Sequence, residues 1–343
     1  MNVLVIGGSR FIGPPVVRRL IAYGHNVTLF NRGQSPTSTP QEVNTIKGDR
    51  RNLAQFVAAL RQTNPDVVLD MIPVIESDAT EIMEAFRGFA KRIVSISSMD
   101  VYRAFGRILG TETGDVENEV LTEESPLRKN LYPYRGEIQR GNDDPNRLLD
   151  HYDKIPIEHI VLSDKELVGT VLRLPMVYGP GDYQHRLYGY LRSMVDKRDF
   201  ILLEDGLAGW RSTRGYVEDI ADAIIKAVVD DRTASEVFNV ADSKFHSERE
   251  WEELIAKAMN WHGEIRTIPS DALPESLRSN FDTRHHLMVD SSKIRNTLGW
   301  SHRTDLIAAI QNTAEYELLN PPDSFRVRYD EEDVAWKSFT MKK

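Results

Sequence analysis

A glycine-rich turn near the start of the chain carries the clearest chemistry in the sequence. It follows an apolar run at Val3–Ile6, and two prolines, whose missing amide is harmless at a helix start, come directly after it. The turn consists of Gly7, Gly8, Ser9, Arg10, Phe11, Ile12 and Gly13. Glycine allows a sharp turn and a close approach of the backbone, while the amides and the dipole of a helix N-terminus bind an anion. We therefore expect the turn to bind the pyrophosphate of a dinucleotide, the alternative being an ordinary strand-to-helix turn.

Short β-branched runs alternate with amphipathic stretches around this turn and after it. The runs predicted as strands are Val3–Ile6, Val27–Phe30, Val67–Leu69, Ile93–Ile96 and Thr170–Leu174. The stretches predicted as helices are Phe11–Tyr23, Leu53–Arg61, Ser77–Phe86 and Lys154–Val168. Continuous apolar strands imply a sheet that is covered on both faces, and their alternation with helices implies parallel pairing. The sequence therefore predicts an α/β fold of the Rossmann type, with a doubly wound parallel sheet.

The second half of the chain interrupts this pattern and then resumes it. Between Arg103 and Asp150 the alternation stops, and residues 111–125 hold six acidic residues and no basic one, which is typical of a long loop or a partly ordered lid. Further elements are predicted at Leu187–Lys197, Gly215–Val217, Asp219–Val229 and Val237–Val240. We expect residues 1–175, completed by about 215–242, to form the Rossmann domain, and residues 176–214 and 243–343 to form a smaller, interleaved α+β substrate domain. The tail beyond Asn320 is expected to wrap the surface or to fray.

Composition limits the classes of function that fit the chain. Its 343 residues exceed what one core usually supports, which favours two structural units. With 43 basic and 52 acidic residues the formal charge is -9, which argues against nucleic acid as a partner. The absence of cysteine excludes disulfides, a thiolate nucleophile and cysteine-ligated metals. No apolar run reaches the roughly 18 residues that a membrane span needs. No secretory or transit segment is visible, so we expect a cytoplasmic protein.

Several motifs between residues 3 and 300 together resemble one known family. The glycine turn resembles the Gly-Gly-x-x-Phe-Ile-Gly fingerprint of the extended short-chain dehydrogenases/reductases, the NAD-dependent epimerase/dehydratase family. Further segments that resemble this family, in family order, are Ser97–Tyr102, Leu172–Gly181, Gly215–Ala221, Phe238–Val240 and Lys293–Trp300. Arg10 stands in place of the middle glycine, as in atypical members and in the related chloroplast stem-loop RNA-binding proteins. The resemblance implies a Rossmann fold and a nicotinamide cofactor.

The resemblance also implies which residues contact the cofactor. NAD-preferring members carry an acid at the end of the second strand, whereas this chain has Asn31 and Arg32. A 2′-phosphate would meet cations there, which favours NADP, unless these residues are merely solvated. Asp49 matches the acid that contacts adenine, although a turn-forming aspartate explains it equally well. Met71, in the segment Asp70–Pro73, stands where small residues usually flank the nicotinamide ribose.

The family's catalytic tyrosine and lysine are four residues apart, and here that spacing is broken. Tyr152 lies only two residues before Lys154, so on a regular helix the two would point about 200° apart. Pro156 fits only the first turn of a helix, which predicts a start near Asp153, with Asp153 as N-cap and Tyr152 outside the helix. Tyr152 then remains free to reach the nicotinamide. The alternative is a packed tyrosine and a surface pair of Lys154 with Glu158.

Other candidate site residues are implied by the same resemblance. Ser98 matches the third catalytic member, whose hydroxyl contacts the reacting oxygen, and Tyr134 is a second candidate tyrosine, supplied by the long loop. Asp100 stands where sugar 4,6-dehydratases carry an acid, but their second acid is Met99 here, which argues against elimination. Arg211 and Arg214 fall where the family grips nucleotide diphosphates, the alternative being a solvated basic turn.

Two remaining features are expected to be structural. Arg173 is predicted to anchor the Tyr-Gly-Pro-Gly loop at residues 178–181. His285 and His286 are expected to form a surface pair, because no spacing joins them to acids, and no metal site is predicted.

Two functions remain open from the sequence. The first is an NAD(P)-dependent epimerase or reductase that acts on a hydroxyl or keto group of a small molecule, a nucleotide sugar being one candidate, with Ser98, Tyr152 and Lys154 as catalytic residues. The second is a catalytically silent dinucleotide-binding protein, regulatory or RNA-binding, because the tyrosine–lysine spacing is broken. The family habit of pairing two helices per subunit implies a homodimer.

Overall fold

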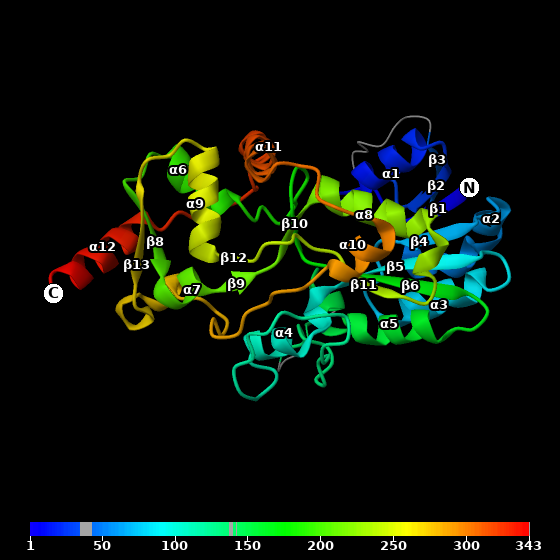
Figure 1. The fold of residues 1–343 in the computed structure, drawn as a ribbon, viewed down its shortest axis with the longest axis horizontal. Helices are drawn as coiled ribbons and strands as arrows, with labels where there is room; N and C mark the ends of the chain where they lie inside the picture. The colour runs from blue at the N-terminus through cyan, green and yellow to red at the C-terminus, as the bar shows by residue number, and fades with distance from the viewer. Residues whose placement is uncertain (35–42, 137–139, 142, 343) are drawn as a thin grey trace.

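The computed structural model describes residues 1–34, 43–136, 140–141 and 143–342, and it contains a seven-stranded parallel sheet in the half of the molecule that holds the N-terminus (Figure 1). The strand order is β11-β6-β5-β4-β1-β2-β3, and every neighbouring pair is parallel. The strands are β1 (Asn2–Ile6), β2 (Asn26–Asn31), β3 (Asn44–Lys47), β4 (Val67–Asp70), β5 (Arg92–Ser98), β6 (Val168–Leu174) and β11 (Val237–Asn239). The chain runs from β1 towards one edge and then returns to build the other side from β4. In sheets of this topology ligands bind at such a reversal, which lies here at the carboxyl ends of β1 and β4, and the predicted Rossmann fold is confirmed.

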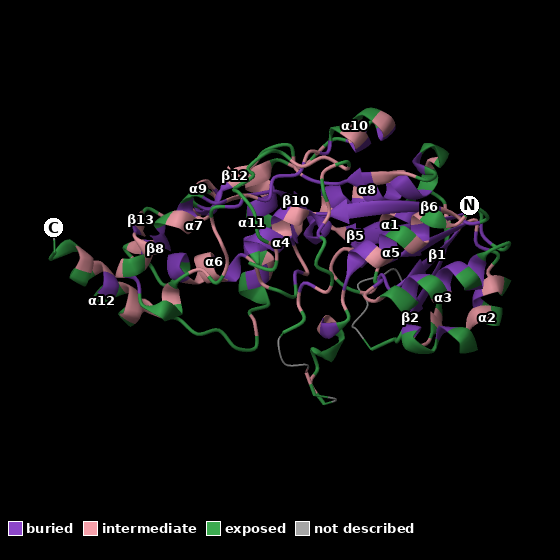
Figure 2. Cartoon of the chain, turned by 90° about the horizontal axis from the view of Figure 1, so that it is seen from below, coloured by how far each residue is buried: buried purple, intermediate pink, exposed green. Residues whose placement is uncertain are grey.

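Side chains alternate across the sheet and build one apolar layer on each face. Val3 and Val5 pack with helices α1 (Gly13–Ala22) and α8 (Val217–Val229) on one face. Leu4 and Ile6 pack on the other face with α3 (Glu76–Phe86) and α5 (Lys154–Ser163). This period of two, with both faces covered, is what continuous apolar strands require. Figure 2 shows the buried residues concentrated in these strands and in the inner sides of the helices.

Two of the predicted helices differ from the observed ones for local reasons. The segment predicted at Leu53–Arg61 is a 3₁₀ turn at Arg50–Gln55, in which Asn52 has a non-helical backbone conformation, followed by α2 (Val57–Gln62). The helix predicted to run to Val168 ends at Ser163. There the carboxylate of Asp164 accepts hydrogen bonds from the amides of Glu166 and Leu167, which turns the chain into β6.

The segment predicted as a loop at Arg103–Asp150 begins with a short helix, α4 (Arg103–Ile108). Its two arginines hold the acidic stretch that follows, since Arg103 and Arg107 both pair with Glu117, at 2.9 and 3.0 Å. The described remainder is irregular apart from a 3₁₀ turn at Arg147–Asp150. The acidic stretch is therefore tied to α4 by ion pairs.

Smaller elements gather at the end of the molecule away from the sheet (Figure 1). Three strand pairs lie outside the main sheet: β7 (Met176–Tyr178) with β10 (Arg214–Tyr216), β9 (Arg211–Ser212) with β12 (His246–Ser247), and β8 (Phe200–Glu204) with β13 (Glu264–Ile268). The accompanying helices are α6 (Tyr188–Val195), α7 (Asp205–Gly209), α9 (Glu248–Ala258) and α11 (Leu306–Leu319), whereas α10 (Ser292–Leu298) packs beside the main sheet on α8 and β11. Further 3₁₀ turns lie at Met99–Val101, Asp231–Thr233, Ser270–Ala272 and Glu275–Leu277.

The tail beyond Asn320 contains a docked helix, α12 (Tyr329–Thr340), rather than a frayed end. Trp336 lies against Phe200 at 6.1 Å between ring centroids, and the guanidinium of Arg266 lies 5.0 Å from the Trp336 ring. The mixed charges of this segment drew attention away from its aromatic residues, and the sequence therefore did not predict the helix. Across the described ranges, no helix combines the length and apolar character that crossing a lipid bilayer requires.

Candidate functional site

The glycine turn joins β1 to α1 through backbone that only small residues tolerate. Gly7 and Gly8 have φ values of 95° and 76°, and a Cβ on Gly13 would come within 2.3 Å of the carbonyl carbon of Gly8. Helix α1 begins at Gly13 with no side chain capping its N-terminus. A backbone cradle at a helix start, beside the sheet crevice, fits the pyrophosphate of a dinucleotide.

The remaining residues of the turn line the same bend. Ser9, Phe11 and Ile12 are partly exposed and Arg10 is exposed. Phe11 has a φ of 47°, and its ring meets the edge of Tyr183 at 6.4 Å between centroids. A Cβ on Gly181 would lie 3.4 Å from the Cα of Phe11, so the Tyr-Gly-Pro-Gly loop lies against the turn.

Three candidate cofactor residues lie at the ends of β2 and β3. The side-chain oxygen of Asn31 accepts a hydrogen bond from the amide of Gly33 at 2.8 Å, while its nitrogen is buried without a partner among the described residues. Arg32 is exposed beside it. The carboxylate of Asp49 caps the next 3₁₀ turn by accepting from the amide of Arg51 at 3.0 Å, and this hydrogen bond lowers the pKa of Asp49. The turn-forming role of Asp49 is therefore present, and its contact with adenine stays a prediction.

The segment after β4 runs beside the glycine turn. The amide of Met71 donates to the carbonyl of Ile6 at 3.1 Å, and a Cβ on Gly7 would lie 3.1 Å from Ile72. The buried carboxylate of Asp70 pairs with Arg50. Arg50 also pairs with Asp78 at 3.0 Å. Sequence reasoning missed this buried cluster, whose only signal is an acid that ends an apolar strand.

Helix α5 begins where the proline predicted, and this places the candidate tyrosine outside it. Its first residue is Lys154, and Asp153 is the N-cap, with its carboxylate accepting from the amide of Ile155 at 2.9 Å. Asp153 also forms a fully buried ion pair with Arg128 at 3.0 Å. The predicted N-cap is confirmed, and Tyr152 precedes the helix.

Tyr152 reaches the carboxyl end of β5 despite its irregular spacing. Its hydroxyl donates to the carboxylate of Asp100 at 2.8 Å, beside the hydroxyl of Ser98, and the amine of Lys154 lies 5.6 Å from the centre of its ring. Tyr134 donates to the same oxygen of Asp100 at 3.3 Å, with its ring 5.2 Å from that of Tyr152. The structure thus brings together Ser98, Asp100, Tyr134, Tyr152 and Lys154, which we call the tyrosine cluster.

Burial sets the protonation of the tyrosine cluster. It raises the pKa of Tyr152 well above 10, helped by the nearby carboxylate of Asp100, so that Tyr152 keeps its proton. Burial also raises the pKa of Asp100, while the hydrogen bond from Tyr152 opposes that rise. The pKa of Lys154 is lowered to about 8 by burial, against the attraction of Asp100 and Asp70. The cluster therefore presents a neutral tyrosine as a proton donor beside a cation that titrates near neutrality.

Lys154 is not in a surface pair with Glu158, so that alternative is wrong. Its buried amine donates to the backbone carbonyls of Pro73 and Ile96. Glu158 is buried too, and it pairs with Arg173 at 2.7 Å. Arg173 therefore ties β6 to α5, and also binds the hydroxyl of Tyr102 at 3.1 Å, rather than anchoring the Tyr-Gly-Pro-Gly loop.

Arg211 and Arg214, the candidate residues for gripping a nucleotide diphosphate, lie outside the tyrosine cluster. Arg211 pairs with Glu250 at 2.9 Å and donates to the carbonyl of Phe245. Arg214 is buried, pairs with Glu248, and lines a separate pocket of about 310 Å³. Neither arginine is in a solvated basic turn.

The predicted histidine surface pair is wrong. His285 is buried, and its carbonyl accepts from the indole of Trp210, while a ring nitrogen of His286 accepts from the amide of Arg211 at 3.2 Å. Across the part of the chain that the structure describes, no three histidine, aspartate or glutamate side chains gather as a metal site would require.

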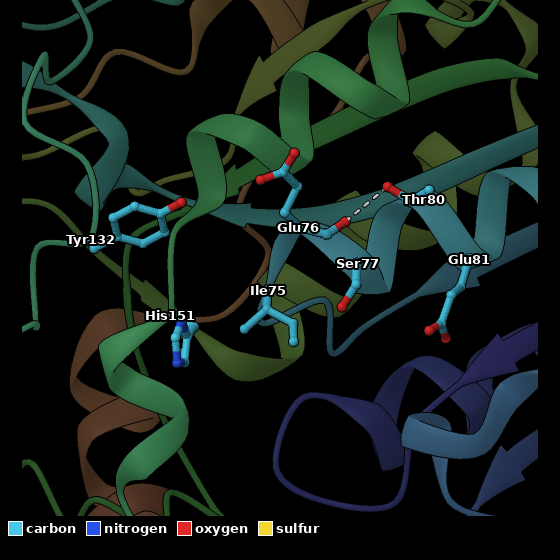
Figure 3. A pocket seen from close by; sticks show the side chains of 7 residues that line it. All are labelled: Ile75, Glu76, Ser77, Thr80, Glu81, Tyr132 and His151. Carbon is cyan, nitrogen blue, oxygen red and sulfur yellow. Dashed lines mark hydrogen bonds between the residues drawn. The ribbon is translucent and has the colours of Figure 1, made fainter. Parts of the chain in front are cut away.

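A second hollow, of about 440 Å³, lies where the start of α3 faces the residues next to the tyrosine cluster (Figure 3). Its walls come from the first turns of α3 and from two loop residues, Tyr132 and His151. Figure 3 shows Ile75, Glu76 and Ser77 at the helix start, opposite these two loop side chains. No pattern in the sequence indicated this hollow, because its walls come from segments far apart in the chain.

Comparison with known proteins decides the family. The model of the NAD dependent epimerase/dehydratase family matches residues 3–241. The chain belongs to this family. The resemblance inferred from the motifs is thereby confirmed, and the family's dependence on NAD agrees with the cradle at residues 7–13.

Individual members of the epimerase/dehydratase family are only distantly similar to the chain. The chloroplast stem-loop binding protein of 41 kDa b of Arabidopsis thaliana is 24% identical, over 96% of this chain and 82% of that protein. The 3-diazoavenalumate denitrifying reductase of a Streptomyces species is 25% identical, over 88% of this chain and 95% of that protein. Among solved structures, the UDP-glucuronic acid 4-epimerase of Bacillus cereus in complex with UDP-glucuronic acid and NAD is 16% identical. The superposition covers 93% of this chain and 99% of that chain, with a TM-score of 0.67. The likeness to this solved structure supports the fold.

Proposed function

We propose that the chain is an NAD(P)-dependent oxidoreductase that reduces a keto group of a small molecule, with Tyr152 as the proton donor. A bound nicotinamide supplies hydride at its C4. The observation that carries the proposal is the meeting of Ser98, Tyr152 and Lys154 at the carboxyl end of β5, at the sheet edge where the glycine cradle lies. Rossmann proteins bind their ligands at this edge.

The residues of the tyrosine cluster have distinct roles in this proposal. Tyr152 gives its proton to the oxygen of the reacting carbonyl, since its raised pKa keeps it protonated at neutral pH. The ammonium of Lys154, 5.6 Å from the ring, stabilises the phenolate that this transfer leaves. The hydroxyl of Ser98 accepts from the amide of Asp100 at 3.2 Å and is in hydrogen-bonding contact with Tyr152, so it would donate to the same carbonyl oxygen once the substrate lies between them.

Asp100 holds Tyr152 in the protonation state from which a reduction starts. Its carboxylate accepts from Tyr152, which stabilises the neutral phenol that a keto substrate needs as proton donor, and the nearby amine of Lys154 balances the phenolate that the transfer leaves. The neighbouring Met99 provides no second acid, so an elimination lacks its partner.

The end of β2 supports NADP as the preferred cofactor. Asn31 replaces a ribose-binding acid, and its buried, unpartnered side-chain nitrogen is a donor for a ribose or phosphate oxygen. Arg32 is exposed next to it. A carboxylate at this place would repel a 2′-phosphate, whereas these two side chains attract one.

Transfer of labelled hydride tests the proposal. The protein is incubated with NADPH or NADH deuterated at C4 and a panel of keto compounds and sugar nucleotides, and the products are examined by mass spectrometry. We expect deuterium in a product alcohol, and its loss in Tyr152→Phe at unchanged cofactor affinity. Tight cofactor binding without transfer to any member of a broad panel would contradict the proposal and favour a silent dinucleotide-binding protein.

A further inference from the structure

A pocket of about 310 Å³ lies between β7, α6, α7 and α9. Five aromatic side chains line it, namely Tyr178, Tyr190, Trp210, Trp251 and Phe281. We call it the aromatic pocket. Its volume suits one ring system with a few substituents, at the lower end of the range for small-molecule sites.

The rings of the aromatic pocket form two apolar walls. Trp210 and Phe281 meet at 4.9 Å between centroids, and Tyr178 and Trp251 meet at 5.0 Å. The indole nitrogen of Trp210 already donates to the carbonyl of His285 at 2.8 Å. Trp210 therefore presents only apolar ring surface, and the walls favour a planar, apolar ligand group.

Both cations in the wall of the aromatic pocket are already neutralised by carboxylates. Arg214 pairs with Glu248, and both are more than nine-tenths buried. Glu248 also accepts from the hydroxyl of Tyr190 at 2.6 Å. Arg186 pairs with Asp182 at 2.7 Å. A diphosphate would bring two negative charges to a wall that offers no net positive charge, and desolvating it there would be costly.

One polar group of the wall remains available to a ligand. The Nη1 atom of Arg214 is buried and has no hydrogen-bond partner in the described residues. A neutral acceptor oxygen, such as a carbonyl or a hydroxyl, would satisfy this donor without adding charge. The Arg214 guanidinium lies 4.6 Å from the centre of the Trp251 ring, so the pocket offers two ring walls and, beside one of them, a donor without a hydrogen-bond partner in the described residues.

The aromatic pocket shares its apolar core with the tyrosine cluster. Met99, between Ser98 and Asp100 in sequence, packs in one cluster with Trp210 and Phe281. Phe105 belongs to the same cluster, and its ring lies 6.1 Å from that of Tyr134. The aromatic pocket and the tyrosine cluster thus border one apolar core, and a substrate with its keto group at the tyrosine cluster would lie along this core with its other end in the pocket.

We propose that the aromatic pocket binds an uncharged aromatic part of the keto substrate, with one oxygen accepting from Arg214, and that it does not bind the diphosphate of a nucleotide sugar. This inference rests on the proposed function and names its substrate class. It differs from the expectation of a nucleotide sugar, because the arginines that would grip a diphosphate are held by Glu248 and Glu250.

Probe binding to the wild-type protein tests the inference without any variant. With NADPH present, 4′-hydroxyacetophenone, uridine, UDP and UDP-glucose are titrated while tryptophan fluorescence and heat are recorded. We expect saturable quenching by the aromatic ketone and at least tenfold weaker binding of UDP and UDP-glucose. Tighter binding of UDP than of the ketone, or no saturable binding of the ketone, would overturn the inference.

A charge variant sharpens the same test. Glu248→Gln removes the compensating carboxylate, so the affinity for UDP should rise at least tenfold while that for the ketone changes less than threefold. Glu253→Gln is the matched control, since Glu253 lies on the same helix and pairs with Arg249 at the surface, outside the pocket wall. An unchanged UDP affinity in a folded Glu248→Gln protein counts against the inference. Binding of NADPH is measured separately. If the protein does not bind NADPH, the proposed function is wrong, whereas the inference about the aromatic pocket is tested by the ketone and UDP titrations.

Discussion

At the scale of single residues, two tyrosines donate to the same oxygen of Asp100, and only one has the lysine beside it. Tyr152 is the closer donor, at 2.8 Å against 3.3 Å for Tyr134, and its ring lies 5.6 Å from the amine of Lys154. A proton donor needs this stabilising cation once its proton has left. We therefore assign proton transfer to Tyr152 and a supporting position to Tyr134.

Paired phenylalanine variants separate these roles. Tyr152→Phe should lower kcat by about 10²- to 10⁴-fold, the usual contribution of a positioned acid or base, with dinucleotide affinity unchanged. Tyr134→Phe removes only the weaker hydrogen bond and should lower kcat less than tenfold. Steady-state kinetics with the substrate found by hydride transfer provide the measurement. Equal losses in the two variants would refute the assignment.

The titration of Lys154 predicts a pH dependence of the reduction. Its pKa is lowered to about 8, so the amine is charged below that pH and becomes neutral above it. Tyr152 stays protonated over the same range because its pKa is raised. The rate of reduction should therefore fall as the pH rises through about 8, in a pH profile of kcat. The Lys154→Met variant should have a low kcat at every pH and should not show this fall. A kcat of the wild-type protein that stays constant between pH 7 and 9.5 would contradict the role of the lysine.

Part of the site could be predicted from residues alone. Pro156 fits only a first helical turn, and this placed Asp153 at the cap and Tyr152 outside the helix, as the structure shows. The partners of Lys154 and Arg50 could not be predicted, because they are backbone carbonyls and acids brought close by the sheet rather than by the sequence. Contacts that depend on strand order leave no local pattern.

At the scale of elements, α5 is held at its start by one buried acid. Asp153 caps the helix, pairs with Arg128, and accepts from the amide of Tyr132 at 2.6 Å. These contacts join α5 to the long loop after β5. They also fix the point from which Tyr152 leaves the helix, so the cap determines the geometry of the tyrosine cluster.

Removal of this cap should be costly. Asp153→Ala leaves the buried Arg128 without its carboxylate, and we expect a loss of about 3–5 kcal/mol in the free energy of unfolding. Asp305→Ala removes an exposed cap of α11, where the loss should be about 1 kcal/mol. Urea denaturation measures both. Similar losses in the two variants would show that the buried pair does not secure α5.

The regular elements were easier to predict than the ends and the tail. Strands β1, β2, β4, β5 and β6 follow β-branched runs that are buried on both faces, which leaves little ambiguity. Helix α12 was missed because its stabilising contacts are aromatic pairs between distant segments, such as Trp336 with Phe200. Helix α5 was predicted too long, since the turn formed by Asp164 ends it early.

At the scale of the whole molecule, net charge separates an enzyme from a nucleic-acid-binding protein. The chain carries a formal charge of -9, and its similarity to a stem-loop binding protein is only 24% in sequence identity. We expect no retardation of a structured RNA at about 150 mM salt, since phosphate binding requires clustered cations. Gel retardation measures this. Salt-resistant binding of RNA would favour the silent, RNA-binding alternative.

The central claim is that the backbone cradle at residues 7–13 holds a pyridine dinucleotide over the sheet edge where Tyr152 lies. Isothermal titration with NADPH and NADH tests it most directly. The account predicts saturable binding of one dinucleotide per chain, tighter for NADPH than for NADH. Failure of the folded protein to bind either dinucleotide at millimolar concentration would contradict it.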